Sequence, residues 1–211
     1  MTRTQSIGLA ALVAIVAIAA GMLLSRVLLH RSGGPTLAKA TLLEPARPLP
    51  PMAFIDSRGQ PFGPDRLRGH WSILFFGFTS CPDVCPTTLA LLAQVEQQLG
   101  DLPTEQRPQI ILVSVDPQRD TPEQLARYVG SFSPTFIGVT GEQQAISAFA
   151  LNMGVPVAIS PLPGGSYTVD HSAAIFIIDP NGAMRALSST PHNVAIIAED
   201  YRSIVAAHPH L

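Results

Sequence analysis

Lysine is almost absent from this chain, and cysteine is scarce. Of the 13 basic residues among 211, only Lys39 is a lysine, and the formal net charge is -2. Without a cluster of basic residues the sequence has no surface for a phosphate backbone, so nucleic-acid binding is excluded. The two cysteines exclude a disulfide-stapled scaffold, and we therefore expect them to carry local chemistry. Neither a repeat nor a low-complexity pattern is present, which excludes a fibrous or disordered protein.

Long apolar runs, by contrast, are concentrated at the N-terminus. Every residue from 7 to 24 is apolar or glycine, and residues 27–29 extend the run. This length is sufficient to cross a hydrocarbon core of about 30 Å as a helix. We predict a single transmembrane anchor at residues 7–29, preceded by a short cytoplasmic terminus at 1–6. The alternative is a cleaved signal peptide, because residues 17–19 resemble a small-residue cleavage site.

A proline-rich stretch follows the apolar run. Residues 30–50 contain a Gly-Gly-Pro sequence at 33–35 and further prolines up to Pro50. This composition neither packs into a core nor forms a helix, so we predict a semi-extended tether at 30–50. The folded domain is then expected at residues 51–211.

Within that domain, segments typical of strands alternate with segments of helical periodicity. Apolar and β-branched runs predict strands at 71–78, 109–115, 136–139, 173–178 and 184–187, and a hairpin within 52–62. Apolar spacing and capping residues predict helices at 87–99, from Thr121 onward, at 142–151 and at 192–207. This alternation implies a single α/β or α+β domain whose sheet is covered by helices on both faces.

The two cysteines lie four residues apart at a predicted junction between a strand and a helix. Cys81 and Cys85 follow the buried run 71–78, and ligand sites in open α/β sheets gather at the carboxyl ends of strands. A helix N-terminus also stabilises a thiolate. At this spacing both sulfurs can face one point, which suits two ligands of a soft metal or, with a local bend, a disulfide. The neighbouring prolines disfavour the alternative of two buried core cysteines.

His171 is the candidate third ligand. It immediately precedes the predicted strand 173–178, so it is expected at a loop near the same edge of the sheet. Two thiolates and one imidazole form a soft, mixed site that suits copper, with zinc as the main rival. An ordinary surface histidine is the alternative reading. Roles for Asp83, Asp116 and Asp170 stay open between orienting the ligands and forming turns or caps.

Three motifs of the chain together resemble the Sco/SenC family. They are the segment FTSCPDVCP at 78–86, the Val-Asp-Pro sequence at 115–117 and the Asp-His-Ser sequence at 170–172. The resemblance covers the chain from about residue 51 to the C-terminus and extends to the single N-terminal anchor. It implies a thioredoxin-like α/β fold, held outside the cytoplasmic membrane or in the mitochondrial intermembrane space.

The resemblance also implies a copper-handling role. Cys81, Cys85 and His171 would bind one copper per chain and deliver it to the binuclear copper centre of cytochrome c oxidase, or reduce the cysteines of that centre. The expected partners are the copper-bearing oxidase subunit, other periplasmic copper chaperones and the membrane that holds the anchor. The preference for arginine over lysine, with abundant Ala and Pro, indicates a GC-rich bacterial genome. We therefore expect a single-pass protein of the bacterial inner membrane with its domain in the periplasm.

A thiol–disulfide oxidoreductase is the alternative from a different functional class. In that reading Cys81 attacks the disulfide of a partner and Cys85 resolves the mixed disulfide. Three residues separate the cysteines, whereas thioredoxin-type redox motifs have two, and His171 would have no role in such an enzyme. The sequence therefore favours a non-enzymatic copper metallochaperone over the enzyme.

Overall fold

The computed structural model describes residues 13–22, 24–25 and 35–211, and the chain divides into the units Met1–Thr36 and Leu37–Leu211. In the first unit, residues 13–22 and 24–25 are helical. Over the described ranges, no helix combines the length and the apolar character needed to cross a membrane.

The predicted membrane anchor at 7–29 lies partly outside the described residues. The predicted cytoplasmic terminus at 1–6 lies wholly outside them. Both therefore stay predictions.

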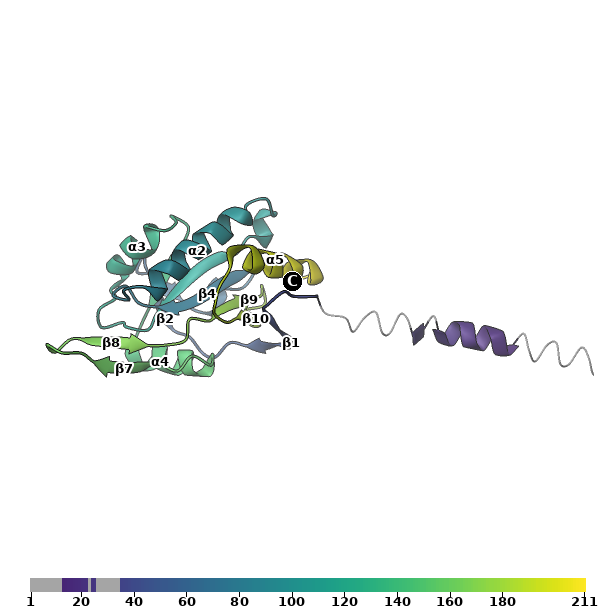
Figure 1. Cartoon of the computed structure of the whole chain (residues 1–211), viewed down its shortest axis with the longest axis horizontal. Helices are drawn as coiled ribbons and strands as arrows, with labels where there is room; N and C mark the ends of the chain where they lie inside the picture. The colour runs from purple at the N-terminus through teal and green to yellow at the C-terminus, as the bar shows by residue number, and fades with distance from the viewer. Residues whose placement is uncertain (1–12, 23, 26–34) are drawn as a thin grey trace, which may run out of the picture. The chain divides into compact units, whose positions relative to one another are not determined.

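An eight-stranded mixed sheet forms the centre of the second unit (Figure 1). Its strands are β1 (Thr41–Pro48), β2 (Phe54–Asp56), β3 (Pro61–Phe62), β4 (Ser72–Gly77), β5 (Gln109–Ser114), β6 (Ile137–Thr140), β9 (Ile175–Ile178) and β10 (Ala183–Ser188). The strand order is β1-β10-β9-β4-β5-β6-β2-β3. Strands β4, β5 and β6 are parallel, whereas β9 is antiparallel to β4 and the outer strands are antiparallel to their neighbours.

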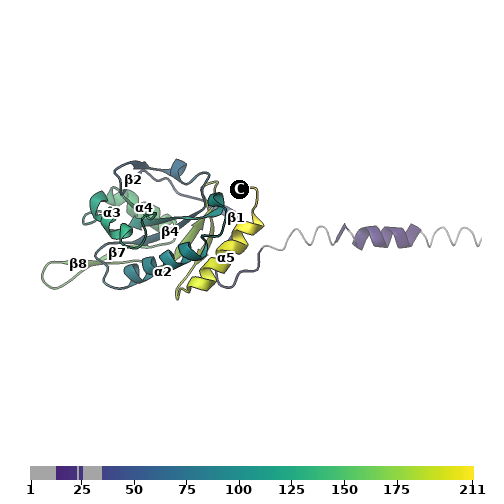
Figure 2. The same cartoon turned by 90° about the horizontal axis from the view of Figure 1, so that it is seen from above.

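Helices cover both faces of this sheet, as the alternating pattern predicts. They are α2 (Val84–Gln98), α3 (Pro122–Gly130), α4 (Gln143–Asn152) and α5 (Val194–Ala207), with short 3-10 turns at Pro64–Arg66 and Thr104–Gln106. Helices α2, α3 and α5 lie on one face and α4 on the other (Figures 1 and 2). The predicted cap of α3 is confirmed, because the Thr121 hydroxyl accepts the backbone N–H of Gln124 at 3.3 Å.

The tether prediction is wrong for its second half. Residues 41–48 form β1, which pairs antiparallel with β10. The prolines of this segment are compatible with a strand because β1 is the edge of the sheet, where a missing N–H costs little. Leu42 and Leu43 also pack against the core. The folded unit therefore begins near Leu37 and not at residue 51.

The hairpin between residues 158 and 170 was not expected from the sequence. Strands β7 (Ala158–Pro161) and β8 (Tyr167–Asp170) pair only with each other and project from the body of the domain in both views (Figures 1 and 2). Their sequence lacks the long apolar alternation typical of a buried strand. Three of the four residues of β7 are exposed, and only Val169 of β8 is buried.

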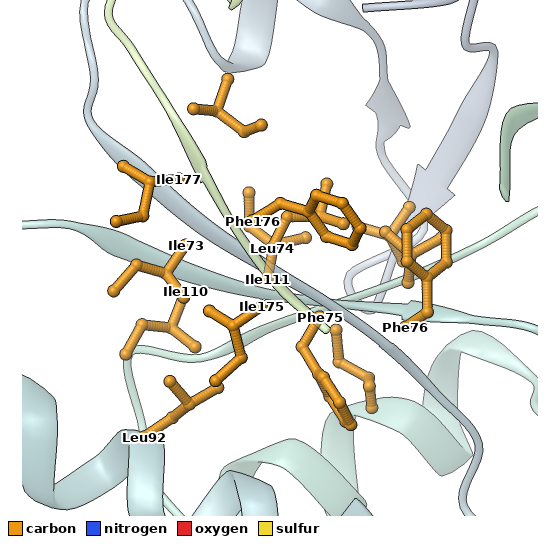
Figure 3. Packing of buried hydrophobic residues seen from close by; sticks show 14 of the residues in the cluster. Ile73, Leu74, Phe75, Phe76, Leu92, Ile110, Ile111, Ile175, Phe176 and Ile177 are labelled. Atoms are coloured by element: carbon orange, nitrogen blue, oxygen red, sulfur yellow. The ribbon is translucent and has the colours of Figure 1, made fainter. Parts of the chain in front are cut away.

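The core is built around β4, all six residues of which are buried. Its apolar side chains pack with those of β5, β9 and α2, as Figure 3 shows for Phe75, Ile110, Ile175 and Leu92. Because β4 is covered on both faces by helices and flanked on both edges by strands, it is the least mobile place from which a functional loop can start.

One buried carboxylate attaches the start of the folded unit to the last helix. Asp200 of α5 is 2% exposed and accepts the backbone N–H groups of residues 38, 39 and 40 at 2.5 to 3.0 Å. Three donors from one segment converge on a single side chain, so this carboxylate holds the chain in place just before β1.

Replacing Asp200 by Ala removes the acceptor of three backbone donors. We expect the free energy of unfolding to fall by about 2–3 kcal/mol, because hydrogen bonds to charged groups are the stronger ones and the donors lose their partner. Urea unfolding measures the effect. The matched control is Asp65→Ala, since the Asp65 side chain is 86% exposed and its ion pair lies at the surface. Equal stability of the two variants would contradict the role given to Asp200.

Candidate metal centre

The two cysteines and His171 meet at the carboxyl end of β4. The loop after β4 carries Cys81, and Cys85 lies in the first turn of α2. Strand β9 runs antiparallel to β4 with Ile175 opposite Phe75, so the segment before β9 returns to the same end of the sheet. As a result, Nε2 of His171 lies 3.8 Å from Sγ of Cys85, although the two residues are 86 positions apart in sequence.

The two thiols differ in exposure. Cys81 is half-buried and Cys85 is fully buried, and both are free. Sγ of Cys81 accepts the backbone N–H of Cys85 at 3.4 Å, a contact that the N-terminus of α2 provides. Burial raises the pKa of the Cys85 thiol, and its contact with Cys81 raises it further.

Aromatic rings and one carbonyl orient His171. The imidazole packs edge-on against Phe75 and Phe78, with ring centroids 6.3 and 5.9 Å apart. Its Nδ1 lies 3.0 Å from the carbonyl oxygen of Ser172. A carbonyl can only accept, so Nδ1 carries the proton and the lone pair of Nε2 is directed toward Cys85. Burial lowers the pKa of His171, so the imidazole is neutral near neutral pH, as a metal ligand must be.

The distance between Cys85 and His171 fits two ligands of one metal ion. Metal–sulfur and metal–nitrogen bonds of about 2.3 and about 2.0 Å place the two donors about 3.5–3.8 Å apart at tetrahedral to trigonal angles. Cys81 is not gathered with them, because no cluster of three or more His, Cys, Asp or Glu within the described ranges could hold a metal ion. Cys81 does line the same open pocket of about 340 Å³ as His171, so a rotation of its side chain can change where the sulfur points.

The three candidate carboxylates have other partners, which for Asp83 is the hydroxyl of Thr87 at 3.4 Å. Asp83 is the exposed N-cap residue of α2, without a side-chain capping bond. Asp116 is buried and pairs with Arg119. Asp170 accepts the hydroxyl of Ser160 across the β7–β8 hairpin at 2.7 Å. The cap or turn reading therefore holds for the position of Asp83, and Asp116 and Asp170 hold the loops around the site together.

Asp120, which the sequence analysis did not single out, attaches the cysteine loop to β5. It accepts the backbone N–H and hydroxyl of Thr79 at 3.0 and 2.6 Å, and the hydroxyl of Ser114 at 2.6 Å. Burial raises the pKa of Asp120, against these hydrogen bonds, which lower it. The sequence signal for Asp120 is an acidic residue shortly after the buried strand β5. Because β5 is parallel to β4, its carboxyl end lies beside the start of the cysteine loop.

Comparisons with known proteins identify the family of this chain. The SCO1/SenC family model matches residues 42–206, more than half of the chain. The chain belongs to the SCO1/SenC family. With the mixed sheet and its two helical layers, this confirms the expected thioredoxin-like α/β fold.

Three relatives illustrate this SCO1/SenC membership. A Stutzerimonas stutzeri protein named as copper-binding is 38% identical over 73% of this chain and 75% of its own length. The mouse mitochondrial protein SCO2 homolog is 35% identical over 74% of this chain, which spans 61% of that relative. The structure of Arabidopsis thaliana ScoI with copper bound superposes with a TM-score of 0.70, at 30% identity, covering 74% of this chain and 98% of the other.

Gly77 leaves room for Cys85. A Cβ at this position would lie 2.9 Å from Cδ1 of Leu112 and 3.1 Å from Sγ of Cys85. Gly77→Ala is therefore expected to lower the free energy of unfolding by about 1–3 kcal/mol through overpacking, as measured in urea. In the control Gly130→Ala no atom lies within 4 Å of the added Cβ, so stability should stay the same or rise slightly. A Gly77→Ala variant as stable as this control would show that the site is not tightly packed.

The different exposure of the two thiols and the raised pKa of Cys85 predict very different reactivities. The variant Cys81→Ser keeps only the thiol of Cys85, and Cys85→Ser keeps only that of Cys81. In the metal-free, reduced chain we expect Cys85 to react with iodoacetamide at least about a hundredfold more slowly than Cys81. The reason is that the thiolate is the reacting form. At a fixed pH, each unit by which the pKa is raised lowers the thiolate fraction about tenfold. The rate should keep rising with pH well above 9. In denaturant both variants should react equally, and equal rates in the native state would refute the burial of Cys85.

Proposed function

We propose that this chain is a copper metallochaperone that binds one copper through Cys81, Cys85 and His171. It delivers the metal to the binuclear copper centre of cytochrome c oxidase, or prepares that centre by reducing a disulfide between its cysteines to two thiols, while Cys81 and Cys85 become a disulfide. The observation that carries the proposal is the 3.8 Å approach of Nε2 of His171 to Sγ of Cys85 beside a second, more exposed thiol.

The donor set supports copper over harder metals. Two thiolates favour Cu(I), and the imidazole helps to accommodate Cu(II). The copper-bound relative from Arabidopsis thaliana and a copper-bound ScoI from Bradyrhizobium japonicum support the same metal. Ligation requires deprotonated cysteines, so copper binding releases protons. Oxidation of Cys81 and Cys85 to a disulfide removes two copper ligands at once. Copper release is thereby coupled to the redox state of the cysteines.

The open pocket at the site supports transfer to a partner. Cys81 and His171 both line it, so an incoming ligand can reach the metal from one side while buried Cys85 stays behind. Copper then passes to the copper-bearing oxidase subunit by ligand exchange. The same kind of exchange loads this chain from other periplasmic copper chaperones. The location that we propose is the bacterial inner membrane, with the N-terminal segment as a single anchor and the domain in the periplasm.

A thiol–disulfide oxidoreductase is the second candidate. The observation in its favour is that Cys81 is half-buried, lines the open pocket and accepts an N–H at the start of α2. Its sulfur would attack one sulfur of a partner disulfide and release the other as a thiolate. Cys85 would then attack Cys81 and release the second thiolate, so the partner gains two electrons and this chain gains a disulfide.

Copper titration of the reduced full chain tests the proposal. We expect one tightly bound copper per chain, lost in the Cys81→Ala/Cys85→Ala variant. His171→Ala should weaken binding by more than about a hundredfold, because changes to residues that only support a ligand already cost about 10- to 100-fold. The exposed residue His70 offers the matched control, and His70→Ala should bind as the unchanged protein does.

The same variants separate the two candidates. Reduction of a model disulfide should survive in His171→Ala, whereas copper affinity should collapse. Retained tight, stoichiometric copper in His171→Ala would remove this residue from the site. Absence of tight copper in the unchanged chain, together with efficient disulfide reduction, would favour the oxidoreductase.

A further inference from the structure

The segment that carries His171 has few attachments to the domain. Strands β7 and β8 pair only with each other, and of their eight residues only Val169 is buried. His171 directly follows the last residue of β8. The position of its ring therefore depends on what holds this hairpin against the body of the domain.

Beside the buried side chain of Val169, one polar cluster attaches the hairpin to the domain. The Tyr167 hydroxyl at the start of β8 donates to Oδ1 of Asp116 at 2.7 Å, and Nε of Arg119 donates to Oδ2 of the same carboxylate. Nη1 of Arg119 donates to the backbone carbonyl of Tyr167 at 3.1 Å. Each of the three residues thus contacts the other two, and two of them belong to the loop between β5 and α3.

The charged pair of the cluster is largely shielded from water, and Tyr167 is half-buried beside it. The Asp116 side chain is 2% exposed and that of Arg119 is 29% exposed. The guanidinium carbon of Arg119 lies 3.9 Å from the centroid of the Tyr167 ring, in cation–π contact. Removing one partner from such a buried charge pair leaves the others without compensation, so the contact is broken as a unit.

Phe78 links this cluster to the candidate ligand. The guanidinium carbon of Arg119 lies 5.8 Å from the Phe78 ring, and the same ring packs edge-on against His171. Phe78 also lines the pocket that contains Cys81. Arg119 and His171 therefore share one aromatic neighbour at the base of the cysteine loop.

We propose that Asp116, Arg119 and Tyr167 form a latch that holds the β7–β8 hairpin against the β5–α3 loop and thereby positions His171 for copper. The inference rests on the proposed function for the part that concerns copper. The three are positioning residues, since they act on the metal only through His171. With the latch open, the two cysteines remain in place on the core while the imidazole leaves its place beside Cys85.

Tyr167→Phe tests the latch, because it removes the hydroxyl and keeps the ring under Arg119. In the metal-free full chain we expect amide hydrogen exchange across residues 158–171 to become about tenfold faster or more, with β4 and β5 unchanged. Tyr201→Phe is the matched control, since it loses one hydrogen bond of 2.7 Å to the Gln106 carbonyl away from the site. Hairpin exchange equal to that of the unchanged chain would overturn the latch, whether or not copper binds.

The copper measurement tests positioning separately. In Tyr167→Phe we expect a changed Cu(II) electron paramagnetic resonance spectrum and an affinity lowered about tenfold, with neither change in Tyr201→Phe. Asp116→Asn should also lower the copper affinity. In the double variant Asp116→Asn/Tyr167→Phe the loss of binding free energy should be smaller than the sum of the two single losses. If His171→Ala alters the spectrum and Tyr167→Phe does not, positioning by the latch is refuted. If His171→Ala has no effect on copper, the proposed function fails, while the exchange result still decides the latch.

Discussion

The antiparallel register between β4 and β9 is the constraint on which the site depends. Phe75 pairs with Ile175 near the end of one strand and the start of the other, so the loop that leaves β4 and the loop that enters β9 emerge at one edge. A slip of one residue would turn every side chain of β9 to the opposite face and move His171 away from the cysteines. All four residues of β9 are buried, and this burial holds the register.

Buried carboxylates attach the functional loops to this apolar centre. Asp120 holds the cysteine loop, Asp116 holds the β7–β8 hairpin and Asp200 holds the segment before β1. Each accepts hydrogen bonds from a segment distant in sequence, so each acts as a cross-link where apolar packing is thin. Only 13% of the residues are charged, yet several of the acids are buried. In the low-dielectric interior their hydrogen bonds are stronger, and an unpaired carboxylate would be costly.

The electrostatic state of the metal-free site follows from its burial. The raised pKa of Cys85 keeps that thiol protonated, and the lowered pKa of His171 keeps the imidazole neutral. The buried part of the site therefore holds no net charge and carries little desolvation penalty. A metal cation reverses this balance, because it stabilises the thiolate that burial disfavours. The same packing that buries Cys85 also holds its sulfur 3.8 Å from Nε2 of His171.

Local patterns in the sequence were sufficient for the central strands, the helices and the cysteine motif. Runs such as 71–78 and caps such as Thr121 act over a few residues, and the structure confirms both. The β7–β8 hairpin and β1 were missed, because exposed strands lack a periodic apolar signal and Thr41–Pro48 is stabilised by its partner β10 and not by its own composition.

By itself, then, the sequence determined the α/β class, the pair Cys81 and Cys85 at the start of a helix, and the family motifs that include His171. Only the tertiary structure decided that His171 reaches Cys85, that Cys85 is the buried thiol, and that Asp116, Arg119 and Tyr167 meet. The physical reason is that the contact of His171 with Cys85, and those of Tyr167 with Asp116 and Arg119, join segments dozens of residues apart. Their distances are set by strand register and side-chain packing, which no local pattern of residues encodes.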